Sequence, residues 1–160
     1  MIYVTVGTMH LEFSRLIRKM DDIARITEEK TIIQRGMNSF LPEHCEHFDF
    51  KGREEVEAIQ QEARVVVAHA GIGSVLDALK AGRPLIVVPR LKHFGEHNND
   101  HQLDLARAVE RRGWGQLVMD IDELEEACAH PPPAHTNYSP AKAEFIQAVR
   151  KAIETGISKR

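Results

Sequence analysis

Residues 65–89 read VVVAHAGIGSVLDALKAGRPLIVVP. The stretch begins and ends with apolar runs, Val65 to Ala68 and Leu85 to Val88, and each run is typical of a strand buried on both faces. Between them we expect a helix from Ser74 to Ala81, which ends at Gly82. A strand, a helix and a second strand in this order predict two parallel strands of one sheet.

The same alternation continues on both sides of this stretch. We expect further strands at Ile2 to Val6, Thr31 to Ile33, His47 to Phe50 and Leu117 to Met119, and helices around Phe13 to Met20, Glu54 to Ala63 and Asp100 to Arg112. This order predicts an α/β fold, Rossmann-like, with an open parallel sheet and helices on both faces. We interpret 1–160 as a single domain, with a proline-rich connector at about 130–138 and a C-terminal helix at about 139–155.

The composition narrows the class of protein. Of the 160 residues, 42% are apolar and 28% charged, and a net charge of -3 offers no basic surface for nucleic acid. No apolar run approaches the roughly 20 residues that span a bilayer, and the N-terminal stretch does not resemble a signal peptide. Cys45 and Cys128 are too few for a disulfide framework. We therefore expect a cytoplasmic protein.

Ligands of such sheets bind beyond the carboxyl ends of the strands. Loops that would lie there are Gly7 to His10, His69 to Ser74 and Arg90 to Gln102. In the second loop, Gly71 and Gly73 allow a close approach of the backbone, and a helix begins at once. Its free N–H groups and dipole would suit a phosphate or diphosphate. A plain glycine turn before a helix is the alternative interpretation.

The second loop does not match two common phosphate motifs. Leu76 stands where the dinucleotide-binding pattern G-x-G-x-x-G needs its last glycine, and no glycine loop is followed by Gly-Lys-Ser/Thr. Asp77 is expected in the first turn of the helix. There its carboxylate would either accept hydrogen bonds from ribose hydroxyls or compensate the helix dipole, and the two interpretations are equally good.

Residues 65–113 resemble the donor-binding, C-terminal domain of glycosyltransferase family 28. The resemblance depends on the run from His69 to Leu79 followed by Gly82 to Pro89, and Val6, Gly7 and Thr8 fit the family's first strand and loop. PssE-like subunits of bacterial exopolysaccharide synthesis, and the catalytic subunit of the dolichol-linked UDP-GlcNAc transferase, are similar. The resemblance implies the C-terminal half of a GT-B enzyme, whose donor substrate is a UDP-sugar and which needs no cofactor.

The resemblance also implies roles for individual residues. Those expected to bind the donor are Gly7, Thr8, His69, Gly71, Ile72, Gly73, Ser74, Asp77, His101 and Gln102. The glycine-rich loop would hold the diphosphate, Asp77 the ribose, and His101 and Gln102 the sugar hydroxyls. The family has two glutamines at the last pair, so His101 leaves the sugar open. The uracil is expected near Lys51, Gly52 and Arg53.

A GT-B enzyme places donor and acceptor between two domains, and this chain has room for one. The resemblance therefore implies a membrane-associated, acceptor-binding partner subunit that holds a lipid-linked sugar in polysaccharide synthesis. The chain would lie at the inner face of the membrane only through that partner, docked by its final helix or around Phe94. His10 and Glu96 are candidates for the general base, which the partner could instead supply. Arg90, or its neighbours Lys92 and His93, could add positive charge near the diphosphate.

Two further patterns in the sequence resemble sets of metal ligands. His93, His97 and His101 are spaced as ligands on one helix would be, but Gly95 favours a polar loop. Asp120 and Asp122 form an Asp-x-Asp pattern, in which we interpret Asp122 as a helix N-cap. We expect no metal.

Two functions compete with the transferase. One is a non-catalytic module that senses nucleotide sugars or regulates a partner, and the polar, histidine-rich 90–102 loop favours the enzyme over it. The other is a UDP-sugar epimerase, which normally keeps both domains in one chain.

Overall fold

The structure is a computed structural model, and it describes residues 1–135. The expected helix at about 139–155 and the last part of the expected proline-rich connector, 136–138, lie outside these residues. The strands are β1 (Ile2–Thr5), β2 (Thr31–Gln34), β3 (Glu46–Phe48), β4 (Val65–His69), β5 (Leu85–Val88) and β6 (Gln116–Leu117). The helices are α1 (Ser14–Thr27), α2 (Arg53–Glu62), α3 (Ile72–Lys80), α4 (His101–Arg111) and α5 (Leu124–Ala129), with short 3-10 turns η1 (Lys92–Phe94) and η2 (Ile121–Glu123).

The strands form one six-stranded sheet in the order β3-β2-β1-β4-β5-β6, with every pairing parallel. β1 lies near the middle, where Ile2 pairs with Thr31 of β2 on one side and with Val65 of β4 on the other. Every residue of β4 and β5 is buried, as expected for strands covered on both faces. The predicted α/β fold with an open parallel sheet is confirmed.

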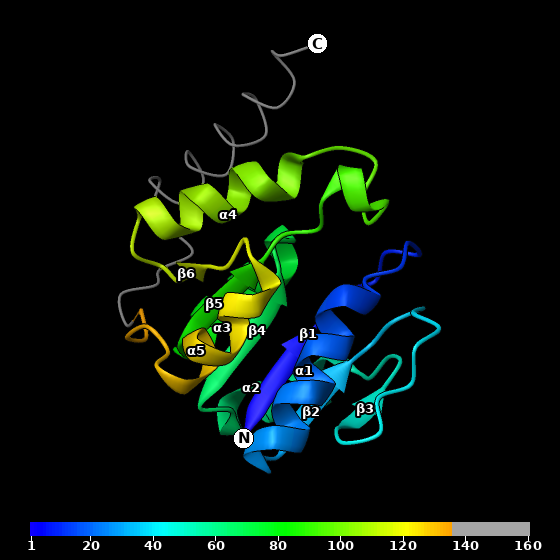
Figure 1. Cartoon of the computed structure of the whole chain (residues 1–160). Coiled ribbons are helices and arrows are strands. Elements are labelled where there is room, and N and C mark those ends of the chain that lie inside the picture. Colours follow the sequence, from blue (N-terminus) through cyan, green and yellow to red (C-terminus); the bar gives the residue numbers. More distant parts are fainter. Residues whose placement is uncertain (136–160) are drawn as a thin grey trace.

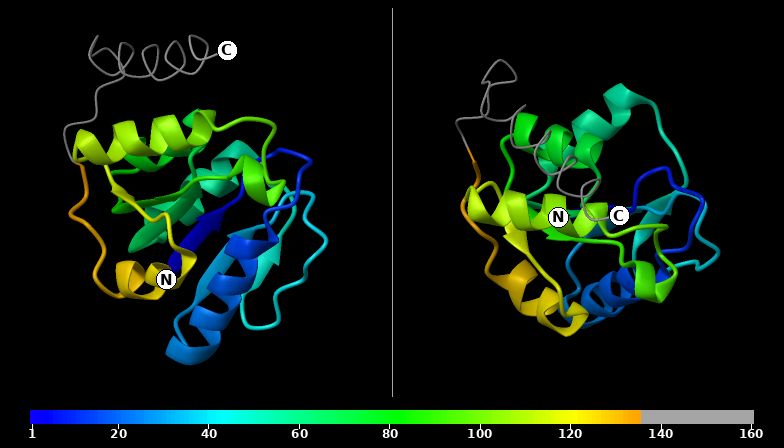
Figure 2. Two further views of the ribbon diagram at one scale, coloured as in Figure 1. Left: turned by 45° about the horizontal axis from the view of Figure 1, so that its top comes forward. Right: turned by 90° about the horizontal axis from the view of Figure 1, so that it is seen from above.

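Helices cover both faces of the sheet (Figures 1 and 2). On one face, α1 and α5 pack their buried side chains, such as Leu16, Ile17 and Leu124, against Val4 and Val67 of the central strands. On the other face lie α2, α3 and α4, whose apolar side chains join those of Val66 and Val87 in a second core. Alternate residues of each strand therefore serve different cores, so the sheet is held from both sides.

Some element boundaries differ from those expected. α3 begins at Ile72, two residues before the expected start, and Gly71 is its N-cap. The sequence did not indicate this start because glycine has no side chain that could form a capping hydrogen bond. Asp77 therefore lies in the second turn of α3, and its expected place in the first turn was wrong. The N-cap expected at Asp122 was also wrong, since Asp120 accepts from the Asp122 N–H at 3.0 Å. Asp122 instead pairs with Lys19 at 3.0 Å.

The strand order has one switch point, between β1 and β4, where the chain turns from building one half of the sheet to the other. In open α/β sheets the crevice beyond the carboxyl ends of such strands is the usual place for a ligand. Here it lies between the loop that follows β1 and the loop that leads from β4 into α3. The fold alone therefore indicates where to look for a site.

Candidate functional site

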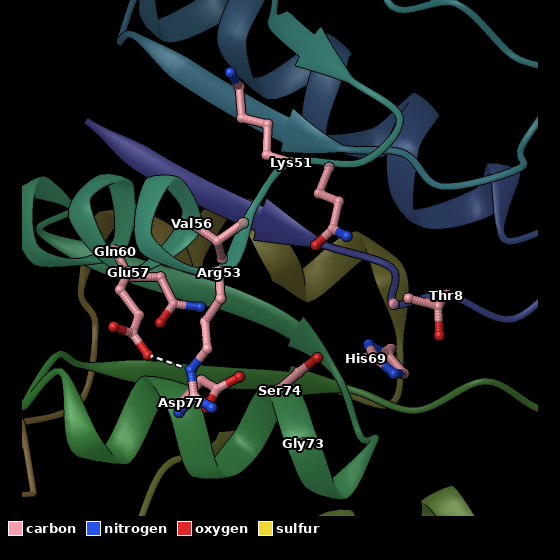
Figure 3. A pocket seen from close by; sticks show the side chains of 12 residues that line it. Thr8, Lys51, Arg53, Val56, Glu57, Gln60, His69, Gly73, Ser74 and Asp77 are labelled. Carbon is pink, nitrogen blue, oxygen red and sulfur yellow. Dashed lines mark hydrogen bonds and ion pairs between the residues drawn. The ribbon is translucent and has the colours of Figure 1, made fainter.

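A cavity of about 420 Å³ opens at this switch point (Figure 3). It is lined from the loop after β1, the ends of β2 and β4, the start of α2 and the first turns of α3. The lining residues are Gly7, Thr8, Gln34, Lys51, Arg53, Val56, Glu57, Gln60, His69, Gly73, Ser74 and Asp77. Six residues expected to bind a donor thus come together in one cavity, namely Gly7, Thr8, His69, Gly73, Ser74 and Asp77.

The amino end of α3 faces this cavity without a cap. The Val75 N–H donates to the Gly71 oxygen at 3.1 Å, so the helical hydrogen-bond ladder begins there. The N–H groups of Ile72, Gly73 and Ser74 precede that bond, and such groups have no partner within a helix. A side chain added at Gly73 would meet nothing within 4 Å. The arrangement offers free donors and the positive end of the helix dipole to an anion.

His69 fills the space between the two glycine loops. A Cβ at Gly71 would lie 2.1 Å from its Nε2, and a Cβ at Gly7 would lie 2.4 Å from its Cε1. Gly7 and Gly71 thus leave the space that the imidazole of His69 occupies, whereas Gly73 faces open space. Burial, with the charge of Arg90 adding to it, lowers the pKa of His69 to about 4. His69 is therefore a neutral side chain at pH 7, able to donate or accept a hydrogen bond.

Asp77 lies across the cavity from these loops, with 41% of its side chain exposed and Lys80 3.8 Å away. Arg53 reaches from the start of α2 between Glu57 and Asp77, and its Nε donates to Glu57 at 2.7 Å (Figure 3). Glu57 chiefly, and Asp77 to a smaller degree, raise the pKa of Arg53. Asp77 thus keeps accessible oxygens in the cavity, near the Arg53 cation that Glu57 binds.

The region expected for uracil is partly in place. Lys51 and Arg53 line the cavity, and Val56 adds apolar surface one turn along α2. Lys51 itself pairs with Glu55 at 2.9 Å. Uracil in this region stays a prediction.

Two glutamines of the lining were not expected. Gln34 is oriented by Tyr3 and Thr5, whose hydroxyls donate to its Oε1 at 3.2 and 2.8 Å. Gln60 is only 2% exposed, and its Oε1 has no hydrogen-bond partner among residues 1–135. Neither belongs to a local motif, so only the pairing of β2 with β1 and the packing of α2 bring them to the site.

Four of the residues expected to bind the donor do not line the cavity. Gly71 packs against His69, and Ile72 begins α3 with 38% of its surface exposed. His101 begins α4, and the Oε1 of the buried Gln102 accepts from the Arg90 N–H at 3.1 Å. Contact of His101 or Gln102 with a sugar stays a prediction.

The two candidate bases occupy different surroundings. His10 is exposed on the loop after β1. Glu96 is 4% exposed, and its carboxylate accepts from Arg15 at 2.9 and 3.0 Å and from the Leu91 N–H at 3.0 Å. These bonds engage both oxygens of Glu96, so its geometry favours a structural role over proton abstraction.

Arg90, expected as a source of positive charge near the diphosphate, does not line the cavity. Arg90 is fully buried, and its guanidinium faces backbone carbonyls rather than the cavity. Lys92 and His93 are exposed on η1. Within residues 1–135, no group of His, Cys, Asp and Glu side chains could hold a metal ion, and His93, His97 and His101 lie on three different local segments. None of the helices in that range is both long and apolar enough to traverse a bilayer.

The fold matches one part of several larger glycosyltransferases of known structure. Solved glycosyltransferases share the fold: the calicheamicin glycosyltransferase CalG4 has a TM-score of 0.62 and 20% identity, with 98% of this chain and 39% of that chain covered. An NMR structure of ALG13 has a TM-score of 0.64 and 18% identity, with 95% of this chain and 96% of that chain covered. The architecture is the C-terminal half of a GT-B glycosyltransferase.

The sequence gives the family. The model of the glycosyltransferase family 28 C-terminal domain matches residues 1–155, and the chain belongs to this family of transferases. The UDP-N-acetylglucosamine transferase subunit ALG13 of Homo sapiens is 31% identical over 121 residues, 70% of this chain and 10% of that protein. The subunit of the same name from Eremothecium gossypii is 38% identical over 97 residues, 54% of this chain and 44% of that protein. The chain thus spans less than half of these relatives.

Proposed function

We propose that the chain is the donor-binding and catalytic subunit of a two-component glycosyltransferase, which moves a hexose unit from a UDP-sugar to a lipid-linked acceptor. The observation that carries the proposal is the pairing, in one cavity, of the uncapped start of α3 with the Asp77 carboxylate. The first suits a diphosphate and the second suits ribose hydroxyls. The similarity to subunits of a UDP-N-acetylglucosamine transferase supports UDP as the nucleotide.

The proposed chemistry follows from the same geometry. Transfer of the sugar leaves UDP, so negative charge grows on the diphosphate as the glycosidic bond to it breaks. The N–H groups of Ile72, Gly73 and Ser74 are fixed by α3 before the reaction, so they stabilise that charge without reorganisation. Neutral His69, at the end of β4, adds a hydrogen bond. The proposal therefore needs neither a metal nor a cofactor.

A partner subunit is the second part of the proposal. The acceptor has to meet the donor at the carboxyl edge of the sheet, and a general base has to take the proton of its hydroxyl. The relatives are transferase subunits by name, and this supports a complex. Phe94 is 56% exposed on η1 beside this edge, with the Arg15 guanidinium 5.1 Å from its ring. We infer that Phe94 takes part in docking, with the partner peripheral to or embedded in the membrane and His10 or a partner residue as base.

Titration calorimetry with UDP tests the nucleotide site. Asp77→Asn keeps the size of the side chain but weakens acceptance from the ribose hydroxyls, so UDP affinity should fall at least tenfold. Asp104→Asn, on α4 and outside the cavity, is the matched control and should bind UDP as the unchanged chain does. Equal affinity of both variants would show that Asp77 does not hold the ribose.

A non-catalytic module that binds nucleotide sugars is the remaining candidate, favoured by the absence of an evident base among the cavity residues of 1–135. Radiolabelled UDP-N-acetylglucosamine, given to membranes with the partner and with or without this chain, separates the two. Label in the lipid fraction that requires this chain and is lost with Asp77→Asn supports the enzyme. Binding of the nucleotide sugar without any transfer supports the module.

A further inference from the structure

Arg90 is the largest fully buried side chain among residues 1–135, and it follows β5 with Pro89 between them. A buried guanidinium is costly unless its donors are satisfied. Burial indeed lowers the pKa of Arg90 to about 10, although the nearby Glu96 and Glu12 act in the opposite direction. The charge persists at pH 7, so the chain retains a cation inside its core. Such a residue needs an explanation beyond packing.

The guanidinium of Arg90 binds the backbone of two loops at once. In the segment after β1, Nη2 donates to the carbonyl of Val6 at 2.9 Å and Nη1 donates to that of Leu11 at 2.7 Å. Nη1 also donates to the carbonyls of Glu12 at 3.3 Å and of Glu96 at 3.2 Å. These bonds cross β4, because β1 and β5 are its two neighbours in the sheet.

Further contacts fix the same pair of loops. The Phe13 ring lies 4.8 Å from the Cζ of Arg90, at the start of α1. The backbone N–H of Arg90 donates to Gln102 at 3.1 Å, and this links the start of α4 to the end of β5. Glu96 is held by Arg15 of α1. Arg90 is thus the centre of a network that joins the loop after β5 to the loop after β1, and the second of these lines the cavity.

The loop after β1 contacts Arg90 on one side and lines the cavity on the other. The C=O and N–H bonds of one trans peptide group point in opposite directions. With the Val6 carbonyl turned to Arg90, the Gly7 N–H turns away from it and donates to Thr5 Oγ1 at 3.2 Å. Gly7 has a φ of 76° there, and Thr8 follows it on the cavity wall. The position of Thr8 therefore depends on bonds that end at Arg90.

We propose that Arg90 is a positioning residue that holds the loop of Gly7 and Thr8 in the shape that receives the diphosphate of the donor. This inference rests on the proposed function for the identity of the ligand. Arg90 does not touch the ligand, since it does not line the cavity. Its fork of donors is what the role requires, because a lysine presents a point charge and cannot serve separate carbonyls in the same way.

Calorimetry with UDP and with uridine tests this role, with Arg90→Lys as the variant. Because the loop serves the phosphates, UDP should bind at least tenfold more weakly, whereas the affinity for uridine should change less than twofold. Arg64→Lys is the matched control, because the side chain of Arg64 pairs with Glu29 away from the cavity. Unchanged UDP affinity in Arg90→Lys, or equal losses for UDP and uridine, overturns the positioning role.

Hydrogen exchange without ligand gives a second measurement. In Arg90→Lys the amides of residues 7–13 should exchange at least tenfold faster than in the unchanged chain, while those of α2 stay as they were. If Arg90→Lys does not fold, Phe13→Leu, which removes the ring beside the guanidinium, serves in its place. Unchanged exchange in the loop overturns the inference alone, whereas failure of the unchanged chain to bind UDP overturns the proposed function and the ligand named here.

Discussion

The carboxyl edge of the sheet has an open half and a closed half. In the open half, between β1 and β4, the N–H groups that begin α3 and the Oε1 of Gln60 have no internal partner among residues 1–135. In the closed half, the loop after β5 meets the segment that leads from β1 into α1. Arg90 and Glu96 are as deeply buried there as Gln60, yet their polar atoms are engaged by carbonyls, Arg15 and a backbone N–H, with only Arg90 Nε unpaired.

The difference teaches how to separate a binding site from a structural network of similar composition. Buried polar groups are normally hydrogen-bonded, so a group of unpaired ones marks a place where a ligand completes the set. A satisfied network, in contrast, holds its surroundings in one shape. The two halves therefore predict opposite responses to substitution, and each of the following experiments compares a residue of one half with a counterpart.

The largest effect is expected for Glu96. Glu96→Ala leaves Arg15 and the Leu91 N–H without their acceptor, and breaking such a buried pair costs about 3–5 kcal/mol. Glu57→Ala, in the open half, removes an exposed pair with Arg53 and should not measurably change stability. Urea unfolding at pH 7 measures both. An equal loss of unfolding free energy in the two variants would contradict the distinction between a structural network and an open site.

The two glycines of the loop before α3 provide the next comparison. Gly71→Ala drives a methyl group into the His69 ring, where a Cβ would lie 2.1 Å from Nε2, and should destabilise the chain by about 1–3 kcal/mol. Gly73→Ala meets open space and lies within α3, so stability should be unchanged or rise by up to about 1 kcal/mol. Thermal unfolding distinguishes them. A stable Gly71→Ala would show that His69 can leave its place between the glycines.

A smaller effect is expected from the titration of His69. Burial lowers its pKa to about 4, so between that value and the ordinary one of about 6.5 the unfolded chain binds more protons than the folded chain. Stability is therefore complete above about pH 6.5 and falls as the pH drops toward 4, by about 1 kcal/mol between pH 7 and pH 5.5. Urea unfolding at these two pH values should show this loss. His69→Gln should lack it, and an equal loss in that variant would assign it to other groups.

The sequence was sufficient to predict the fold because its signals are local. The buried runs of β4 and β5, the turn at Gly82 and the loop of Gly71 to Ser74 each occupy a few neighbouring residues, and the order of the elements does the rest. The same reasoning brought Gly7, Thr8, Ser74 and Asp77 to the correct edge of the sheet. The type and order of these elements could thus be predicted from local signals, although the first residue of α3 could not.

The parts that could not be predicted depend on contacts between distant segments. Arg90 reads as a surface cation until the carbonyls of Val6 and Leu11 are seen around it, about 80 residues earlier in the chain. Gln60 reads as one polar residue of an exposed helix, and only its packing against the sheet makes it part of the cavity floor. The true start of α3 was missed because a glycine N-cap has no side chain to announce it.

The central position of β1 in the sheet has a consequence for folding during synthesis. β1 precedes both of its neighbours in the chain, yet Ile2 finds one partner at Thr31 and the other only at Val65. During synthesis, β1 therefore lacks one of its two neighbouring strands until β4 has left the ribosome. Because this pairing joins residues far apart in the chain, it is expected to form slowly. A nascent chain halted before residue 65 would present an unpaired β1 edge to chaperones or to other nascent chains.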